Sequence, residues 1–145
     1  MDSRSFFLRH HVAITAGAAL MLLVGCGGDR GRASGRVEYN DGTPVAGATI
    51  VARSSTGANA RGQADAEGQF SLGTVERGDG LPPGEYAVII LEELGNPERP
   101  RPRTIPEKYE SLENSGITLS VKPGENVQLN ITIQRLSERK QPKSS

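Results

Sequence analysis

Apolar and polar residues alternate along short stretches of this chain between residues 36 and 133, with no helical pattern among them. The alternation is clearest at 127–133, where Val, Leu, Ile and Ile occupy every second position and Gln, Asn and Thr lie between them. A period of two predicts a strand with one face on a core and one in water. Residues 117–121 follow the same pattern and predict another strand.

Turn-forming residues divide the earlier part of the chain into further short strands. Clusters of Gly, Asn, Asp and Pro such as 40–44 and 66–68 predict reversals, and the stretches between turns predict strands at 36–39, 48–53, 61–65 and around 70–72. Residues 85–91, EYAVIIL, predict a central strand buried on both faces. Residues 92–104 are a polar insertion held extended by three prolines, and 105–109 begin a segment expected to cross between sheets.

About seven short strands at a spacing of 8–12 residues are typical of an all-β fold. We therefore expect a small antiparallel β-sandwich over residues 36–136. Residues 137–145 are polar and carry no packing pattern, so they predict a disordered tail.

Residues 1–25 have the features of an export signal. Arg4 and Arg9 precede an uncharged run at 12–24, which has the length of a signal-peptide core and is short of the roughly 20 apolar residues of a membrane span. Cys26 is the one cysteine of the chain, and the sequence LVGC that ends with it resembles the bacterial lipobox. The resemblance implies that a signal-peptide helix within 1–25 is cleaved off and that Cys26 becomes lipidated.

Acyl chains on Cys26 predict attachment to a membrane, because two chains suffice for stable anchoring. Gly27 stands where an Asp favours inner-membrane retention, so the resemblance implies the outer membrane, with the domain facing the periplasm or the cell surface. The alternatives are an ordinary secretory signal or an uncleaved anchor, with Cys26 incidental. Residues 26–35 then predict a lipid-anchored flexible tether. At full extension its residues 27–35 span about 30 Å.

Composition narrows the function classes. Both histidines, His10 and His11, lie in the leader, so the mature chain has no residues for Ser-His-Asp or Cys-His catalysis or for zinc sites built on His and Cys. We therefore expect a non-enzymatic protein without metal or cofactor. Basic and acidic residues are balanced, whereas nucleic-acid-binding proteins normally show an excess of positive charge. We therefore expect no nucleic-acid partner.

Four short motifs together resemble the carboxypeptidase regulatory-like domains, which group with transthyretin-like (prealbumin-like) and Cna B-type sandwiches. They are Gly35-x-Val37, Asp41-Gly42-x-Pro44-Val45-x-Gly47-Ala48-x-Ile50, Gly68-x-Phe70-x-Leu72 and Leu81-x-Pro83-Gly84-Glu85-Tyr86-x-Val88. The carboxyl half looks like the ending of short planctomycete-type lipoproteins with this domain. By the same resemblance Tyr86 is expected to form a tyrosine corner, its ring in the core and its hydroxyl bonded to nearby backbone.

This chain lacks the residues that catalysis and isopeptide-bond formation require in proteins of this fold. Its hydrolases and dioxygenases use histidine, and its isopeptide bonds need a Lys near the first strand, where this chain has Arg36. Asp41, Asp65 and Glu67 could in principle bind Ca²⁺, but without a dense array of oxygen ligands we expect ordinary turns.

Arg99, Arg101 and Arg103 alternate with prolines and could bind carboxylates or phosphates of a polyanion or a partner. The alternative is a solvated connection, since Glu92, Glu93 and Glu98 lie beside them. The sequence thus predicts a non-catalytic, lipid-anchored envelope module with an unidentified protein or polysaccharide partner. The alternative is a lipoprotein that binds a small ligand or glycan for a transporter or a degradative enzyme. A concave pocket lined by Tyr39, Tyr86 or Tyr109 would favour that alternative, and a filled sandwich would favour the interaction module.

Overall fold

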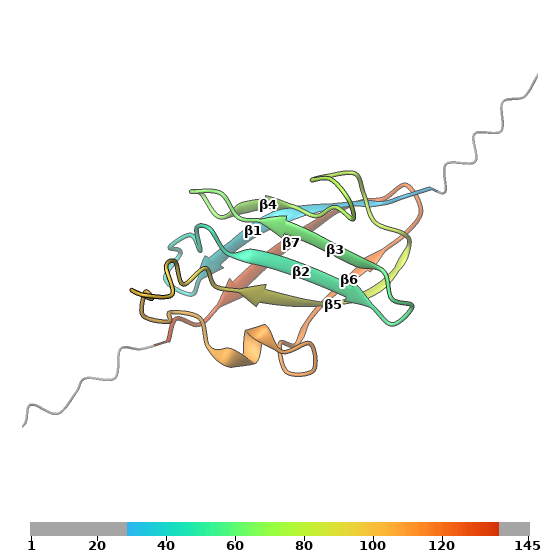
Figure 1. The fold of residues 1–145 in the computed structure, drawn as a ribbon. Helices are drawn as coiled ribbons and strands as arrows, with labels where there is room; N and C mark the ends of the chain where they lie inside the picture. The colour runs from blue at the N-terminus through green and yellow to red at the C-terminus, as the bar shows by residue number, and fades with distance from the viewer. Residues whose placement is uncertain (1–28, 137–145) are drawn as a thin grey trace, which may run out of the picture.

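The computed structural model describes residues 29–136, which form seven strands in two sheets (Figure 1). The elements are β1 (Arg32–Tyr39), β2 (Thr49–Ser54), β3 (Asn59–Gln63), β4 (Gln69–Ser71), β5 (Gly84–Leu91), the 3₁₀ helix η1 (Glu107–Glu110), β6 (Ile117–Val121) and β7 (Asn126–Ile133). The predicted all-β sandwich is confirmed. The leader, Cys26 and the tail at 137–145 lie outside the described residues.

One sheet has the order β4-β1-β7 and the other the order β3-β2-β5-β6. The pairs are antiparallel except β1 with β7, which run parallel over eight residues. The sandwich is therefore mixed rather than wholly antiparallel, because the turn after β6 carries β7 into the other sheet beside β1. The crossing expected to begin at 105–109 was wrong, since residues 92–116 join β5 to β6 within one sheet.

β1 begins at Arg32, four residues before the predicted strand and inside the predicted tether. Gly31 exchanges two backbone hydrogen bonds with Leu81, at 3.0 and 2.8 Å, and Ala33 is buried. Residues 32–35 were missed because their side chains are small or charged and give no alternating apolar pattern, although their backbone pairs with neighbouring strands. The part of the predicted tether from residue 31 onward thus belongs to the sandwich, and residues 27–30 separate Cys26 from it.

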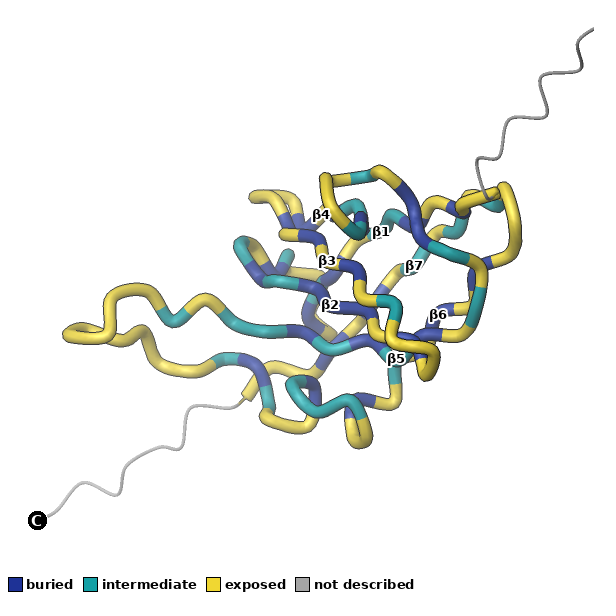
Figure 2. Tube along the Cα trace, turned by 45° about the vertical axis from the view of Figure 1, so that its right-hand side comes forward, coloured by how far each residue is buried: buried dark blue, intermediate teal, exposed yellow. Residues whose placement is uncertain are grey.

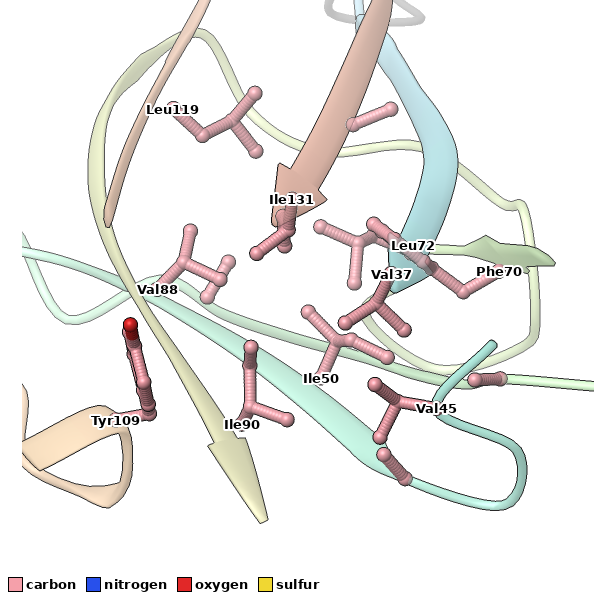
Figure 3. Close-up of a cluster of buried hydrophobic side chains, with 14 of the residues drawn as sticks. Val37, Val45, Ile50, Phe70, Leu72, Val88, Ile90, Tyr109, Leu119 and Ile131 are labelled. Atoms are coloured by element: carbon pink, nitrogen blue, oxygen red, sulfur yellow. The ribbon is translucent and has the colours of Figure 1, made fainter. Parts of the chain in front are cut away.

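Apolar side chains from both sheets meet in one core (Figure 3). The largest fully buried ones are Ile50, Leu72, Leu81, Ile90, Ile105, Ile133, Val37 and Val88. β5 lies between β2 and β6, as predicted for a central strand. Only one of its faces is fully buried, that of Tyr86, Val88 and Ile90, whereas the residues of the opposite face, Ala87, Ile89 and Leu91, are half-buried.

The sandwich has two distinct ends. Because β1 and β7 run in the same direction, the described chain starts at one end and finishes at the other (Figure 1). We call the end at Gly31, with the turn at 122–125, the proximal end. The distal end holds the loops at 40–48 and 92–104 together with residues 134–136, and loop 92–104 extends from it as a long exposed projection (Figure 2).

Candidate functional site

The distal loop, residues 92–104, is closed at its base by one carboxylate. The two oxygens of Glu92 accept the backbone N–H of Thr104 at 2.9 and 3.0 Å, the Thr104 hydroxyl at 2.5 Å and the backbone N–H of Ile105 at 3.2 Å. Hydrogen bonds to a charged acceptor are stronger than those between neutral groups. The carboxylate of Glu92 therefore stabilises the closed base of its own loop.

Thr104 also joins the loop to the distal ends of both β1 and β7. Its hydroxyl lies 2.5 Å from the hydroxyl of Tyr39, at the end of β1, and its carbonyl accepts the N–H of Leu136 at 2.7 Å. The Thr104 proton is donated to Glu92, whose carboxylate can only accept, so Tyr39 is the donor in the first contact. The base of the loop is thus bonded to two other segments of the chain, at Tyr39 and at Leu136.

The arms of the distal loop run side by side beyond this base. Arg101 donates its backbone N–H to the carbonyl of Leu94 at 2.8 Å. At the tip, the carbonyl of Asn96 accepts the N–H of Arg99 at 3.0 Å and the Asn96 side chain accepts that of Glu98 at 2.8 Å. The distal loop with its three prolines is therefore an ordered projection whose chain direction reverses at a hydrogen-bonded turn.

The three arginines of this loop do not form one cationic surface. Arg103 pairs with Glu110 at 3.0 Å and with Glu107 at 3.5 Å, both on η1. Arg101 lines a cleft at the base of the loop, and Arg99 is exposed at the tip. Of the three, Arg103 is thus an internal contact of the domain, and only the other two face outward.

The distal cleft has a volume of about 400 Å³ and lies between the loop at 43–48 and the distal loop. Val45 and Ala48 contribute apolar surface to it, and charged residues of both signs line it, Arg101 and Arg135 together with Glu92 and Glu93. The guanidinium of Arg135 lies 4.0 Å from the ring centre of Tyr39, a cation–π distance, and 3.9 Å from the Asp41 carboxylate. Sequence reasoning missed Arg135, which follows the last strand and carries no pattern of its own.

Of the three acidic residues considered for Ca²⁺, Asp41 and Asp65 cap turns through their side chains. Asp41 accepts the N–H of Thr43 at 2.9 Å, and Asp65 accepts those of Glu67 and Gln69 at 3.0 and 2.8 Å. Hydrogen bonds from Thr43 lower the pKa of Asp41. The bond from the Thr43 backbone N–H has the larger effect and the bond from its side chain the smaller one. Within residues 29–136 no three His, Cys, Asp or Glu side chains gather as metal ligands.

Tyr86 has the predicted tyrosine-corner geometry. Its ring is buried and its hydroxyl donates a 2.6 Å hydrogen bond to the carbonyl of Pro82, four residues earlier. Burial raises the pKa of Tyr86. Tyr39 and Tyr109 are also buried in the core, and of the three tyrosines Tyr39 is the one that borders the distal cleft.

A second cleft, of about 560 Å³, runs between edge strand β3 and loop 73–80. Asp79 organises that loop by accepting the N–H of Thr74 at 2.6 Å and that of Val75 at 3.0 Å. These bonds, that of Thr74 first, lower the pKa of Asp79 to about 2. The carboxylate is therefore part of the loop's scaffold and is not poised for proton transfer near neutral pH.

In the described part of the chain, no helix has the length and apolar character needed to cross a membrane. Comparison of the chain with protein-family models, curated proteins and solved structures gave no match.

Proposed function

We propose that this chain is a non-catalytic interaction module of a bacterial envelope, anchored to a membrane through lipid on Cys26. The leader and the LVGC sequence support the anchor. The lack of histidine after residue 11, together with the use of the one cysteine for lipid, supports a role without catalysis.

The observation that carries the proposal is that the distal loop lies at the end of the sandwich opposite to Gly31. Residues 27–30 allow at most about 17 Å between Cys26 and Gly31, whereas the eight residues of β1 span about 26 Å toward the distal end. A domain anchored through so short a tether keeps its proximal end near the lipid headgroups. It presents the distal loop and cleft to molecules away from the membrane.

A second candidate is a lipoprotein that binds a small ligand or glycan for a transporter or a degradative enzyme. The distal cleft favours it, because an aromatic ring, that of Tyr39, lies there beside charged groups of both signs, Arg101 and Arg135 with Glu92 and Glu93. The interaction module is preferred because all three tyrosines pack in the core and only Tyr39 also borders the cleft.

The anchor is tested by membrane fractionation of Cys26→Ser, with Gly27→Ala as the matched control that keeps the cysteine. We expect Cys26→Ser to leave the membrane fraction and the control to stay in it; retention of both would contradict the lipid anchor. The interaction role is tested by in-cell crosslinking of the tagged full-length protein followed by mass spectrometry. A discrete protein partner supports the module, whereas recovery of lipid and polysaccharide alone favours the second candidate.

A further inference from the structure

β7 leaves a long edge of the three-stranded sheet unpaired within residues 29–136. The sheet order places it last, with β1 as its neighbour, and the two pair without interruption over eight residues. The other edge strands are shorter, three residues in β4 and five each in β3 and β6. β7 is therefore the longest strand edge that the described domain offers.

Two hydrogen bonds show which backbone groups of β7 point outward. Arg32 donates its N–H to the carbonyl of Glu125 at 2.7 Å, and Asn40 donates to that of Ile133 at 2.9 Å. Backbone groups alternate in direction along a strand, so the odd-numbered residues of β7 bond to β1. The N–H and C=O of Asn126, Gln128, Asn130 and Thr132 face the open side, and no backbone bond from elsewhere in residues 29–136 reaches them.

This edge lacks the features that usually prevent strand pairing. Natural edge strands are protected by shortness, charge, proline or a bulge. β7 contains no charged residue and no proline, and its register with β1 has no bulge. Its exposed side chains, Gln128, Asn130 and Thr132, are uncharged. A strand with these properties is suited to accept another strand.

Apolar side chains lie partly exposed along the inner side of the same edge. Val127 and Leu129 on β7, and Ile117 on β6, pack against the core but are only half-buried. β6 is the edge strand of the opposite sheet and contacts β7. A strand added beside β7 would cover these groups with its own apolar side chains at alternate positions.

We propose that the β7 edge binds an extended segment of another protein by strand addition, a specific form of the interaction function proposed above. The segment alternates apolar with uncharged polar side chains and has no proline where its N–H must donate to β7. Its apolar side chains lie beside Val127 and Leu129, and its polar ones beside Gln128 and Asn130. Backbone pairing supplies the attachment, and the apolar positions supply the selectivity.

A second copy of this chain fits the edge poorly. Pairing of β7 with its own copy about a two-fold axis is antiparallel, which points the Gly31 ends of the two copies in opposite directions. The ends are then separated by about the 26 Å length of the strand, so both can reach one membrane through the tether at 27–30, about 17 Å long, only if the paired strands lie along its surface. That orientation does not present the distal loops away from the membrane as proposed above. The chain's own residues 137–145 contain no aliphatic or aromatic side chain to offer.

The test uses the full-length lipidated protein in detergent and the capped probe peptide KVTVTVTVTK, with hydrogen exchange as the readout. We expect the probe to slow amide exchange at 126–133 and not at 117–121. Asn130→Pro removes one outward N–H and no bond to β1, so it should weaken probe binding at least tenfold. Thr118→Pro, at an exposed position of edge strand β6, is the matched control and should bind as the parent does. Unchanged exchange at 32–39 in Asn130→Pro verifies that the β1–β7 ladder is intact.

A second variant, Gln128→Lys with Thr132→Lys, keeps every backbone N–H and adds charge to the edge. It should also weaken binding at least tenfold. Lack of probe protection at 126–133, or equal protection of β6, overturns the proposal. Protection of 126–133 without probe, together with a dimer in sedimentation, assigns the edge to a second copy instead. Cys26→Ser should bind the probe normally, so a failed anchor and a failed edge give different results.

Discussion

Glu92 accepts hydrogen bonds from both the backbone N–H and the hydroxyl of Thr104, at 2.9 and 2.5 Å, although the two residues lie twelve positions apart. This contact turns a proline-rich polar insertion into a loop with a fixed base. Because Thr104 is also bonded to Tyr39 and Leu136, the loop is fastened to the sheet that carries β1 and β7. Its orientation relative to the sandwich is therefore set by partly buried polar contacts as well as by the prolines.

Glu92→Gln should loosen the distal loop and leave the sandwich folded. Hydrogen bonds to a charged group contribute about 1.5–3 kcal/mol, so losing the charge should speed amide exchange across 93–103 by roughly tenfold or more. Glu93→Gln, at an exposed neighbouring position, is the control and should leave exchange unchanged. Equal exchange rates in both variants would show that the prolines alone hold the loop.

Tyr86→Phe should lower the free energy of unfolding by about 1–2 kcal/mol, because it leaves the Pro82 carbonyl without its hydrogen-bond donor. Urea unfolding of the two proteins measures the difference. Tyr109→Phe is a suitable comparison, since its hydroxyl accepts only a long 3.4 Å bond from Gln134 and should contribute less. A larger loss in Tyr109→Phe would contradict the role given to the tyrosine corner.

The strands with strong alternation were predictable from the sequence, and the weakly apolar ones were not. Residues 117–121 form β6 with the predicted bounds, and β7 starts one residue earlier than expected. The first four residues of β1 escaped prediction because Arg, Ala, Ser and Gly give no periodic signal. The parallel β1–β7 pairing escaped it too, because alternation shows which face of a strand is buried and not which strand lies beside it.

The candidate site was only partly visible in the sequence. The alternating arginines drew attention to the distal loop, but their local pattern could not show that Arg103 pairs with η1. Arg135 joins the cleft through Tyr39, a residue nearly a hundred positions away. Such contacts depend on the topology of the sheets, so they could be found only once the fold was in hand.

Gly35→Ala should destabilise the pairing of β1 with β7. A Cβ at this position would lie 1.9 Å from the carbonyl oxygen of Leu129, so the strands must move apart. Forcing an extra carbon into a packed site costs about 1–3 kcal/mol, and we expect the upper part of this range because the obstacle is backbone. Ser34→Ala, at the neighbouring half-buried position, adds no atom and loses one 3.2 Å hydrogen bond from the Gln128 amide, so it should change stability by no more than about 1 kcal/mol. Thermal or urea unfolding compares them, and equal stabilities would contradict this packing.

Acid should open loop 73–80 before it unfolds the sandwich. The N–H groups of Thr74 and Val75 hold the pKa of Asp79 at about 2, below the usual 3.8 of an aspartate. A lowered pKa means that the ionised carboxylate stabilises the loop above about pH 4, and that this contribution is lost as the pH falls through about 2. NMR signals of residues 74–76 should therefore stay constant above pH 4 and shift between pH 4 and pH 2. Asp79→Asn should give the open-loop signals at every pH, whereas Asp65→Asn should disturb only its own turn at 66–68. A titration midpoint near 3.8 for Asp79 would mean that these backbone bonds do not hold the carboxylate in solution.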